Sequence, residues 1–443
     1  MARGPSSAAD LAAALKVDRS TVIRALGSLG HEVVSLGATR RTRYALRRMI
    51  REASSWPIYR IDGDGQASLR GTLESFHGTW RVQWEGEAPE WAGHFSDREG
   101  LWEGFPFFLS DLRPQGILGR LIVRQIARSH RLPEDSRAWI DDDTLVFLSH
   151  FGEDVPGDLV IGDECLRSAL ASRLVPALPL ASVPQGYAEL AELAASSPPP
   201  GSSAGGEHPK FLAVVEHAPD ERRAVLVKFS PPFGQELGRR WADLLTMEFH
   251  ALEILAEAGL ADRGHRLIDA GGRRFLEAPR FDRTPRGGRR GAVSLEALHA
   301  AACGGLPVDW TGRVLDLEAA GLVDQESVRQ TRRLQAFGEL IGNTDMHAGN
   351  LAFRMSDDLP FTVAPAYDML PMLWAPGPQG ELSERSFAPR PPLPAAAVEW
   401  REMLGLARDF WLRVAGDERI SPNFRSTAKA AGGVLTQLSA SFG

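Results

Sequence analysis

The segment LIGNTDMHAGNLAF, residues 340–353, constrains this chain more than any other. A helical pattern over residues 324–341 stops at Gly342, and a polar loop then leads into a short apolar run. The loop carries Asp345 and Asn350, a carboxylate and an amide five residues apart. Two oxygen-bearing side chains on one short connection are suited to orienting a hydroxyl group and binding a metal ion.

Three more polar residues accompany this loop along the chain. Asp368 ends the strand-like run FTVAPAYDML, and Lys228 lies on the apolar strand RRAVLVKFS. Glu248 lies on the helix LLTMEFHALEILAEAGL, where it can pair with the lysine. Protein kinases carry Lys, Glu, Asp-x4-Asn and Asp in this order and use them to position ATP phosphates and Mg²⁺. Each residue alone fits a solvated lysine, a helix-surface glutamate or a turn-capping aspartate better, so the prediction depends on the series.

The stretch SSPPPGSSAGGEHPKF precedes the lysine strand. Residues 196–200 have the composition of a spacer between domains, whereas residues 202–210 predict a glycine-rich loop that wraps a phosphate. Gly205 and Gly206 would let backbone N–H groups approach the phosphates. Lys210 would neutralise charge at the exit of the loop or anchor the following strand.

Metal ligands of the His and Cys type are not expected. His347 has no second His or Cys at ligand spacing, so we expect it to brace the cofactor-binding loop through Asp345 or a backbone carbonyl. Cys165 and Cys303 are far apart and lack metal-ligand spacing, so we expect neither a zinc motif nor a disulfide framework.

The first 51 residues are basic, whereas the whole chain is acidic. They hold ten Lys or Arg and three Asp or Glu, a net charge of +7 in a chain whose total is −7. SAADLAAALKVDRSTVIRALGSLG predicts two short helices joined by a tight turn, and EVVSLGATRRTRYALRR predicts a β-hairpin. The expected apolar stripes of the helices are Leu11, Ala14 and Leu15, then Val22, Ile23, Leu26 and Leu29.

This pattern resembles a winged helix–turn–helix, which would contact DNA or RNA with the start of its second helix and its hairpin tip. The candidate contact residues are Arg19, Ser20, Thr21, Arg24, Arg40, Arg41 and Arg43. Only about ten residues precede the first helix, so the usual leading helix is expected to be missing or very short. The alternative is an amphipathic helical cap with a solvated basic face.

The middle of the chain mixes strands and helices. We expect strands at residues 68–73, 80–84 and 145–148 and a helix at residues 117–129. Tryptophans at positions 80, 84, 91 and 102 are expected to form core. No run of about 18 uncharged apolar residues occurs, so no membrane contact is expected. Met1 is not followed by the apolar core of a signal peptide, which favours a cytoplasmic location.

With these residues in hand, the chain resembles the HipA family of bacterial toxin kinases. The resemblance is carried by GNTDMHAGN, PAYDML, PRFDR, SSAGGEHPKF, FPFFLSDLRPQG and GEDVPGDL. It covers about residues 60–440, and a winged helix in front is similar to the HipH (YjjJ-like) branch. It implies an α+β architecture, a bilobal HipA-like protein-kinase fold with a small α+β subdomain and an N-terminal winged helix–turn–helix. The expected parts are residues 1–51 (winged helix), 52–195 (subdomain), 196–286 (kinase N-lobe) and 287–443 (helical C-lobe).

The resemblance also implies a toxin of the toxin–antitoxin type that is an ATP- and Mg²⁺-dependent serine/threonine protein kinase. Asp345 would be the catalytic base, Asn350 and Asp368 the Mg²⁺ ligands, Lys228 the ATP-phosphate lysine and Glu248 its partner. Ser202 or Ser203 would be autophosphorylated.

The partners implied are DNA, an antitoxin and a protein substrate such as an aminoacyl-tRNA synthetase or a translation factor. Gly349, where many relatives have lysine, and Glu207-His208 depart from the family pattern and bear on substrate choice.

Two other functions fit the same residues. A DNA-binding or DNA-cleaving toxin or repressor could use a repurposed kinase fold, because acidic Mg²⁺ ligands also serve an Mg²⁺-dependent DNase. A small-molecule phosphotransferase shares the same layout of lysine, Asp-x4-Asn and aspartate.

Overall fold

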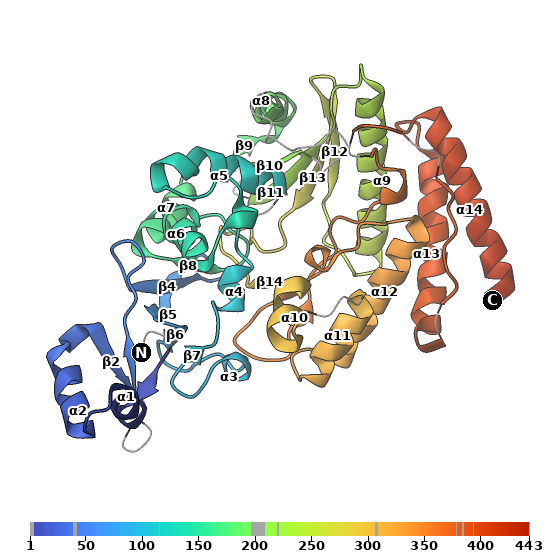
Figure 1. Cartoon of the computed structure of the whole chain (residues 1–443). Helices are drawn as coiled ribbons and strands as arrows, with labels where there is room; N and C mark the ends of the chain where they lie inside the picture. Colours follow the sequence, from blue (N-terminus) through green and yellow to red (C-terminus); the bar gives the residue numbers. More distant parts are fainter. Residues whose placement is uncertain are drawn as a thin grey trace.

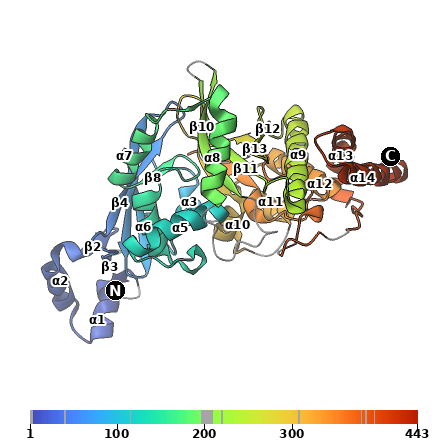
Figure 2. The same ribbon diagram turned by 90° about the horizontal axis from the view of Figure 1, so that it is seen from above.

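The computed structural model of the chain describes residues 4–38, 42–114, 116–195, 209–218, 221–305, 309–377, 379–382, 385–392 and 394–442. The molecule is elongated (Figure 1; Figure 2), with its N-terminal helices at one end and its C-terminal helices at the other. In this described part, no helix is long and apolar enough to cross a membrane.

The N-terminal domain contains the expected pair of helices and hairpin. Helices α1 (Ala8–Leu15) and α2 (Arg19–Ser28) pack on a three-stranded antiparallel sheet of order β1-β3-β2. Its strands are β1 (Ser6–Ser7), β2 (Val33–Leu36) and β3 (Arg43–Leu46). From residue 4 to α1 the chain forms only β1, so a leading helix is absent from the described residues.

The core of this domain is smaller than the apolar stripes predicted. Ala8, Val22 and Leu26 are buried, but Leu15 and Ile23 are 65% and 46% exposed. Two helices and a short sheet can bury only one stripe from each helix, and the described residues of this domain contain no third α-helix to cover the remainder.

The N-terminal domain is packed onto the middle subdomain. Leu36 and Ala45 from the hairpin are buried against Phe76 and Leu101. Next along the chain, Arg48 pairs with Asp142 at 2.6 Å. The hairpin is therefore partly an interface element.

The middle subdomain is built on a five-stranded antiparallel sheet of order β7-β6-β5-β4-β8. Its strands are β4 (Ser55–Ile61), β5 (Ala67–Phe76), β6 (Thr79–Trp84), β7 (Leu101–Trp102) and β8 (Leu159–Ile161). Its helices are α3 (Ala92–Phe95), α4 (Phe107–Ser110), α5 (Gly116–His130), α6 (Asp141–Phe151) and α7 (Asp163–Ser172). The expected tryptophan core is present, with Trp91 packed edge-on against Phe107 and Phe108.

One strand prediction in this subdomain is wrong. Residues 145–148 lie inside α6 and are buried. A short continuous apolar run has no period that separates a buried strand from a buried helix, and here three aspartates in the first turn favour the helix.

A second five-stranded sheet, the large sheet, follows in the order β12-β13-β11-β10-β9. Its strands are β9 (Leu178–Pro179), β10 (Lys210–Ala218), β11 (Glu221–Phe229), β12 (Arg266–Ala270) and β13 (Arg273–Pro279). Helix α8 (Val183–Ala195) packs on this sheet through Val183 and Tyr187. Strand β9 and α8 were expected with the middle subdomain, but their packing places them on the large sheet.

The C-terminal half is mostly helical around a small sheet. Its helices are α9 (Glu236–Glu257), α10 (Leu295–Cys303), α11 (Trp310–Ala319), α12 (Gln325–Ile341), α13 (Ala397–Gly416) and α14 (Pro422–Phe442). The sheet has the order β14-β15-β16, with β14 (Ala292–Ser294), β15 (Ala352–Arg354) and β16 (Thr362–Val363). Helix α9 lies beside α13 in both views (Figure 1; Figure 2).

Buried charges join the middle subdomain to the C-terminal half. Asp282 accepts hydrogen bonds from Arg283 at 2.6 Å, Arg280 at 2.9 Å and the backbone amide of Gly157 at 2.9 Å. Asp154 accepts from the same two arginines at 2.7 and 2.8 Å. Burial would raise the pKa of Asp282, but the two arginines outweigh it and hold that pKa far below its usual range. The motifs GEDVPGDL and PRFDR therefore form a joint between two parts of the molecule.

Candidate functional site

Two lysines leave the large sheet on the same face. In the β10–β11 pair, Lys210 is directly opposite Lys228, and Leu212 is opposite Leu226. Alternate residues of a strand point to opposite faces. The intervening Phe211 is buried under α8. The lysines and leucines therefore line the other face of the sheet.

Lys228 is the centre of a buried charge cluster. Its Nζ lies 2.5 Å from Oε1 of Glu248 on α9 and also donates to Oδ1 of Asp368. Burial would lower the pKa of Lys228, but Asp368 and Glu248 outweigh it and raise that pKa above its usual range. Burial raises the pKa of Glu248, against the attraction of the lysine. The lysine thus stays charged and is the cation that stabilises the buried Glu248 and the half-buried Asp368.

The loop that follows α12 places Asp345 in solvent. Gly342 ends the helix in a left-handed conformation with φ of 78°, and a Cβ there would lie 3.0 Å from the ring of Trp374. A residue with a side chain would therefore be strained at this position. Asp345 follows three residues later and is exposed.

Asn343 ties the loop to the segment that carries Asp368. Its Oδ1 accepts from the backbone amide of Asp345 at 3.0 Å, and its Nδ2 donates to the backbone carbonyl of Asp368 at 3.3 Å. The sequence prediction did not include this residue among the site residues. Its position inside GNTDMHAGN was the available signal, but its role depends on a contact between segments 25 residues apart.

The rest of the loop is braced internally. The side-chain amide of Asn350 donates to the backbone carbonyl of Asp345 at 2.9 Å. Nδ1 of His347 accepts from the amide of Gly349 at 3.1 Å, and the indole of Trp310 donates to the carbonyl of His347 at 2.9 Å. The side chain of His347 contacts the backbone of its own loop, but its partner is the amide of Gly349 and not the expected Asp345 or a carbonyl.

Asp368 has an unusual backbone conformation. Its φ is 51°, in the left-handed region that residues with a side chain seldom adopt. The preceding Tyr367 donates from its hydroxyl to the carbonyl of Gly349 at 2.8 Å and stacks on Phe281 with ring centroids 5.8 Å apart. Tyr367 and Asn343 thus fix the two sides of this strained residue, and Tyr367 was also missed by the sequence prediction.

The predicted metal ligands fit a hard divalent cation. The Nδ2 of Asn350 is used within the loop, so its Oδ1 is the atom left to bind a cation. Asp368 follows 18 residues later in the chain order of a kinase, and its carboxylate contacts Lys228. Mg²⁺ commonly takes one or two protein oxygens and completes its shell with water and phosphates. Within the described ranges, no group of three or more His, Cys, Asp or Glu forms an all-protein metal cage.

The predicted glycine loop falls outside the part of the chain that the structure describes. It contains Ser202, Ser203, Gly205 and Gly206. Lys210, at the start of β10, is described and half-buried, and its charge acts on Glu248.

The predicted DNA-contact residues divide into two groups. Those at the start of α2 are exposed: Arg19, Ser20, Thr21 and Arg24. Arg43 pairs with Asp97 at 2.5 Å and with Glu99 at 3.3 Å, both in the middle subdomain. Arg40 and Arg41 lie outside the described residues.

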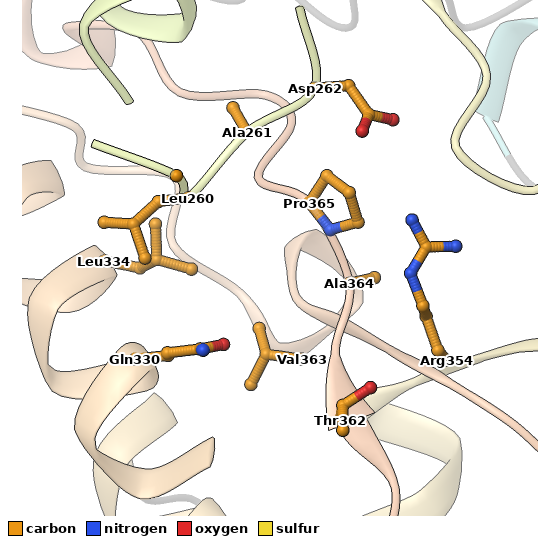
Figure 3. Close-up of a pocket in the computed structure, with 11 residues that line it drawn as sticks. Leu260, Ala261, Asp262, Gln330, Leu334, Arg354, Thr362, Val363, Ala364 and Pro365 are labelled. Atoms are coloured by element: carbon orange, nitrogen blue, oxygen red, sulfur yellow. The ribbon is translucent and has the colours of Figure 1, made fainter. Parts of the chain in front are cut away.

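A cavity of about 310 Å³ is lined in part by residues 362–365, in the segment that leads to Asp368. Figure 3 shows Asp262 and Arg354 on one side of it and Leu260 and Leu334 on the other. None of its lining residues belongs to the predicted nucleotide or metal site, so the cavity is separate from the Lys228 cluster.

Comparison with known proteins identifies relatives over most of the chain. Residues 52–170 match the family described as "YjjJ-like toxin, middle domain", and residues 202–432 match the "HipA-like C-terminal domain". The Toxin YjjJ of Escherichia coli (strain K12) is 36% identical over 428 residues, which cover 96% of this chain and 94% of the relative.

A solved structure has the same fold. It belongs to the Shewanella oneidensis MR-1 toxin–antitoxin system HipA, HipB and its operator DNA complex. The TM-score is 0.54 at 16% identity, and the match covers 87% of this chain and 96% of that chain. The expected α+β, HipA-like fold is therefore confirmed.

Proposed function

The chain belongs to the family of YjjJ-like toxins with a HipA-like C-terminal domain, and from this premise we propose that it is an ATP- and Mg²⁺-dependent serine/threonine protein kinase. The proposal rests on one observation, the contact of Lys228 with both Glu248 and Asp368 in a buried cluster. Protein kinases need the lysine–glutamate pair and the metal-binding aspartate in place at the same time. This cluster brings the three groups together.

The face of the large sheet that carries the lysines is suited to a nucleotide. Lys210 and Lys228 would neutralise phosphate charge, while Leu212 and Leu226 on the same face would contact an apolar base. Cationic and apolar neighbours on one surface match the two ends of ATP.

Asp345 would act as the base. Its exposed carboxylate would accept the proton of a serine or threonine hydroxyl as the hydroxyl oxygen bonds to the γ-phosphorus. The bond from that phosphorus to the β–γ bridging oxygen breaks, and ADP leaves. Asn343 would fix the position of Asp345 relative to Asp368. Mg²⁺ bound by Asn350 and Asp368 would neutralise charge on the phosphates.

We further propose that Ser202 or Ser203 is autophosphorylated, and that the protein works in the cytoplasm with a protein substrate, an antitoxin and DNA. The complex of HipA, HipB and operator DNA supports the last two by analogy only. The exposed arginines of α2 give a DNA contact a physical basis.

The kinase is tested with purified protein, γ-labelled ATP and Mg²⁺. Label should transfer to the protein or to an added protein substrate, and Asp345→Asn should lower the rate at least about 100-fold. The matched control is Asp358→Asn, which changes another exposed carboxylate on the loop after β15 and should leave the rate unchanged. The protein would be a nuclease and not a kinase if the wild type takes up no label and cuts DNA in the presence of Mg²⁺. Asp368→Asn should then abolish the cutting.

The DNA contact is tested separately by the salt dependence of binding to duplex DNA. Arg24→Ala should lower the slope of log K against log salt by about one. Arg43→Ala should leave the slope unchanged, because Arg43 is paired with Asp97 and Glu99. An equal effect of the two substitutions would contradict this placement of the DNA on α2.

A further inference from the structure

One face of α9 is tied to the C-terminal helices by polar contacts along its length. Asp243 contacts Ser421, His250 contacts Asp417 at 2.7 Å, and Glu257 pairs with Arg413 at 2.7 Å. These three α9 residues are spaced by seven, about two helical turns, so they form a single row. The row faces α13 and the C-terminal turn, residues 417–421, which joins α13 to α14.

The contact at Asp243 is buried and forms the start of α14. Both oxygens of Asp243 are used, by the amide of Ser421 at 2.9 Å and by its hydroxyl at 2.6 Å. Asp243 is 4% exposed. On the preceding turn of α9, Arg240 lies over the ring of Phe424 at 4.7 Å. The start of α14 is therefore fixed to α9 by a buried acceptor and a stacked guanidinium.

The C-terminal turn is also joined to the large sheet. Arg274 on β13 donates to the hydroxyl of Thr246 on α9 at 2.8 Å and to the carbonyl of Arg419 at 2.9 Å. Arg419 in turn lies over the ring of Phe249 at 5.6 Å. One guanidinium thus joins the sheet, the helix and the turn.

Glu248 lies on the opposite side of α9 from the row. At about 100° per residue, its direction differs from that of the row by about 160°. The helix is therefore held between Lys228 on one side and the C-terminal turn on the other. Glu248 is 2% exposed and its Oε2 has no hydrogen-bond partner among the described groups, so a free helix would gain by moving it toward water.

We propose that Asp243, His250, Asp417 and Ser421 are positioning residues that hold Glu248 against Lys228. This inference rests on the proposed function, because it names what fixes part of the same site. In many kinases the corresponding helix moves, and its position controls activity. Here the chain's own C-terminal turn holds the helix, so the lysine–glutamate pair is assembled without an activating partner.

The test compares Asp243→Ala and Asp243→Asn with Glu402→Gln in the full chain. Glu402→Gln is the matched control, because it breaks an ion pair from α13 to Arg333 on α12 and leaves α9 untouched. Hydrogen exchange of the α9 amides should be at least about 10-fold faster in Asp243→Ala, intermediate in Asp243→Asn and unchanged in Glu402→Gln. Unchanged exchange in both Asp243 variants would overturn the proposal, and this measurement needs no catalysis.

Kinetics then separate positioning from general stability. kcat/KM for ATP should fall about 10-fold in Asp243→Ala and less in Asp243→Asn. In a Glu248→Gln background, Asp243→Ala should add less than about 2-fold, because the group to be positioned is already lost. A further 10-fold loss of kcat/KM in that background would show that Asp243 acts only on general stability, which would contradict the inference. If the wild type transfers no phosphate, the proposed kinase fails while the exchange data still decide the role of the turn.

Discussion

Lys210 and Lys228 occupy facing positions on adjacent antiparallel strands, and both leave the large sheet on the same side. Their surroundings differ. Lys228 is enclosed by two carboxylates, whereas Lys210 is half-buried and forms no ion pair within the described residues. Lys228 therefore stabilises the two carboxylates, and under the proposed function it would also contact ATP, whereas Lys210 would contact a phosphate of ATP.

Substitution of the two lysines should therefore have different effects. Lys228→Met leaves Glu248 and Asp368 without their cation and should cost about 3 kcal/mol of unfolding free energy as well as nearly all phosphotransfer. Lys210→Met should change the unfolding free energy by less than about 0.5 kcal/mol and raise KM for ATP about 5- to 10-fold. Urea unfolding and steady-state kinetics measure both. Equal loss of stability in the two variants would contradict the prediction.

Substitution of Asn343 should lower the phosphotransfer rate as much as substitution of the residues that it positions. Asn343→Asp keeps the acceptor for Asp345 but replaces the donor to Asp368 by a second acceptor, which repels that carbonyl. We expect kcat to fall about 100-fold, because small displacements of reacting groups have effects of this size. Asn423→Asp, at an exposed site on α14, is the matched control. A rate close to that of the wild type in Asn343→Asp would show that the loop is held by other contacts.

Asp282 should control the stability of the joint between the middle subdomain and the C-terminal half. Asp282→Asn leaves Arg280 and Arg283 with Asp154 as their one acidic partner among the described residues and should lower the unfolding free energy by about 3 kcal/mol. The control is Asp64→Asn, which breaks an exposed ion pair with Arg286 and should cost less than about 1 kcal/mol. Urea denaturation followed by tryptophan fluorescence compares the two. Similar costs would mean that the joint does not depend on its buried charge.

His265 should make the fold less stable in acid. Burial, with the nearby charge of Arg223, lowers its pKa to about 4, and Glu253 at 3.5 Å is not placed to accept a hydrogen bond from Nδ1. The unfolded chain has a His pKa of about 6.5. Between these values the unfolded state binds a proton that the folded state does not, so stability falls as the pH falls.

His265→Gln removes this proton uptake. The loss of unfolding free energy from pH 7 to pH 5 should be about 2 kcal/mol smaller in the variant than in the wild type. His31→Gln, at an exposed histidine, is the matched substitution for comparison. A pH dependence that is the same in all three proteins would contradict the prediction.

The sequence predicted the parts of the site that depend on local pattern. The helix expected at residues 324–341 is α12. The candidate residues could be identified from the sequence because each lies in a short motif and the motifs follow one another in a fixed order: Lys228, Glu248, Asp345, Asn350 and Asp368. The contacts of Asn343 and Tyr367 could not be predicted from the sequence, because their hydrogen-bond partners lie in distant segments. The pairing of Arg43 with Asp97 was missed for the same reason, since the two lie 54 residues apart. The strand predicted at residues 145–148 was wrong because a continuous apolar run has no period that distinguishes a strand from a helix.

The place of the C-terminal turn in the chain sets the order in which the site is completed during synthesis. Asp243 and Ser421 are 178 residues apart, a stretch that a ribosome makes in about 10 to 35 s. Under the proposed role of the turn, a nascent chain already carries Lys228 and Asp345 while the C-terminal turn does not yet hold α9 and its Glu248. The toxin would then stay inactive on the ribosome that makes it, which gives a cell time to provide an inhibitor before the kinase is complete.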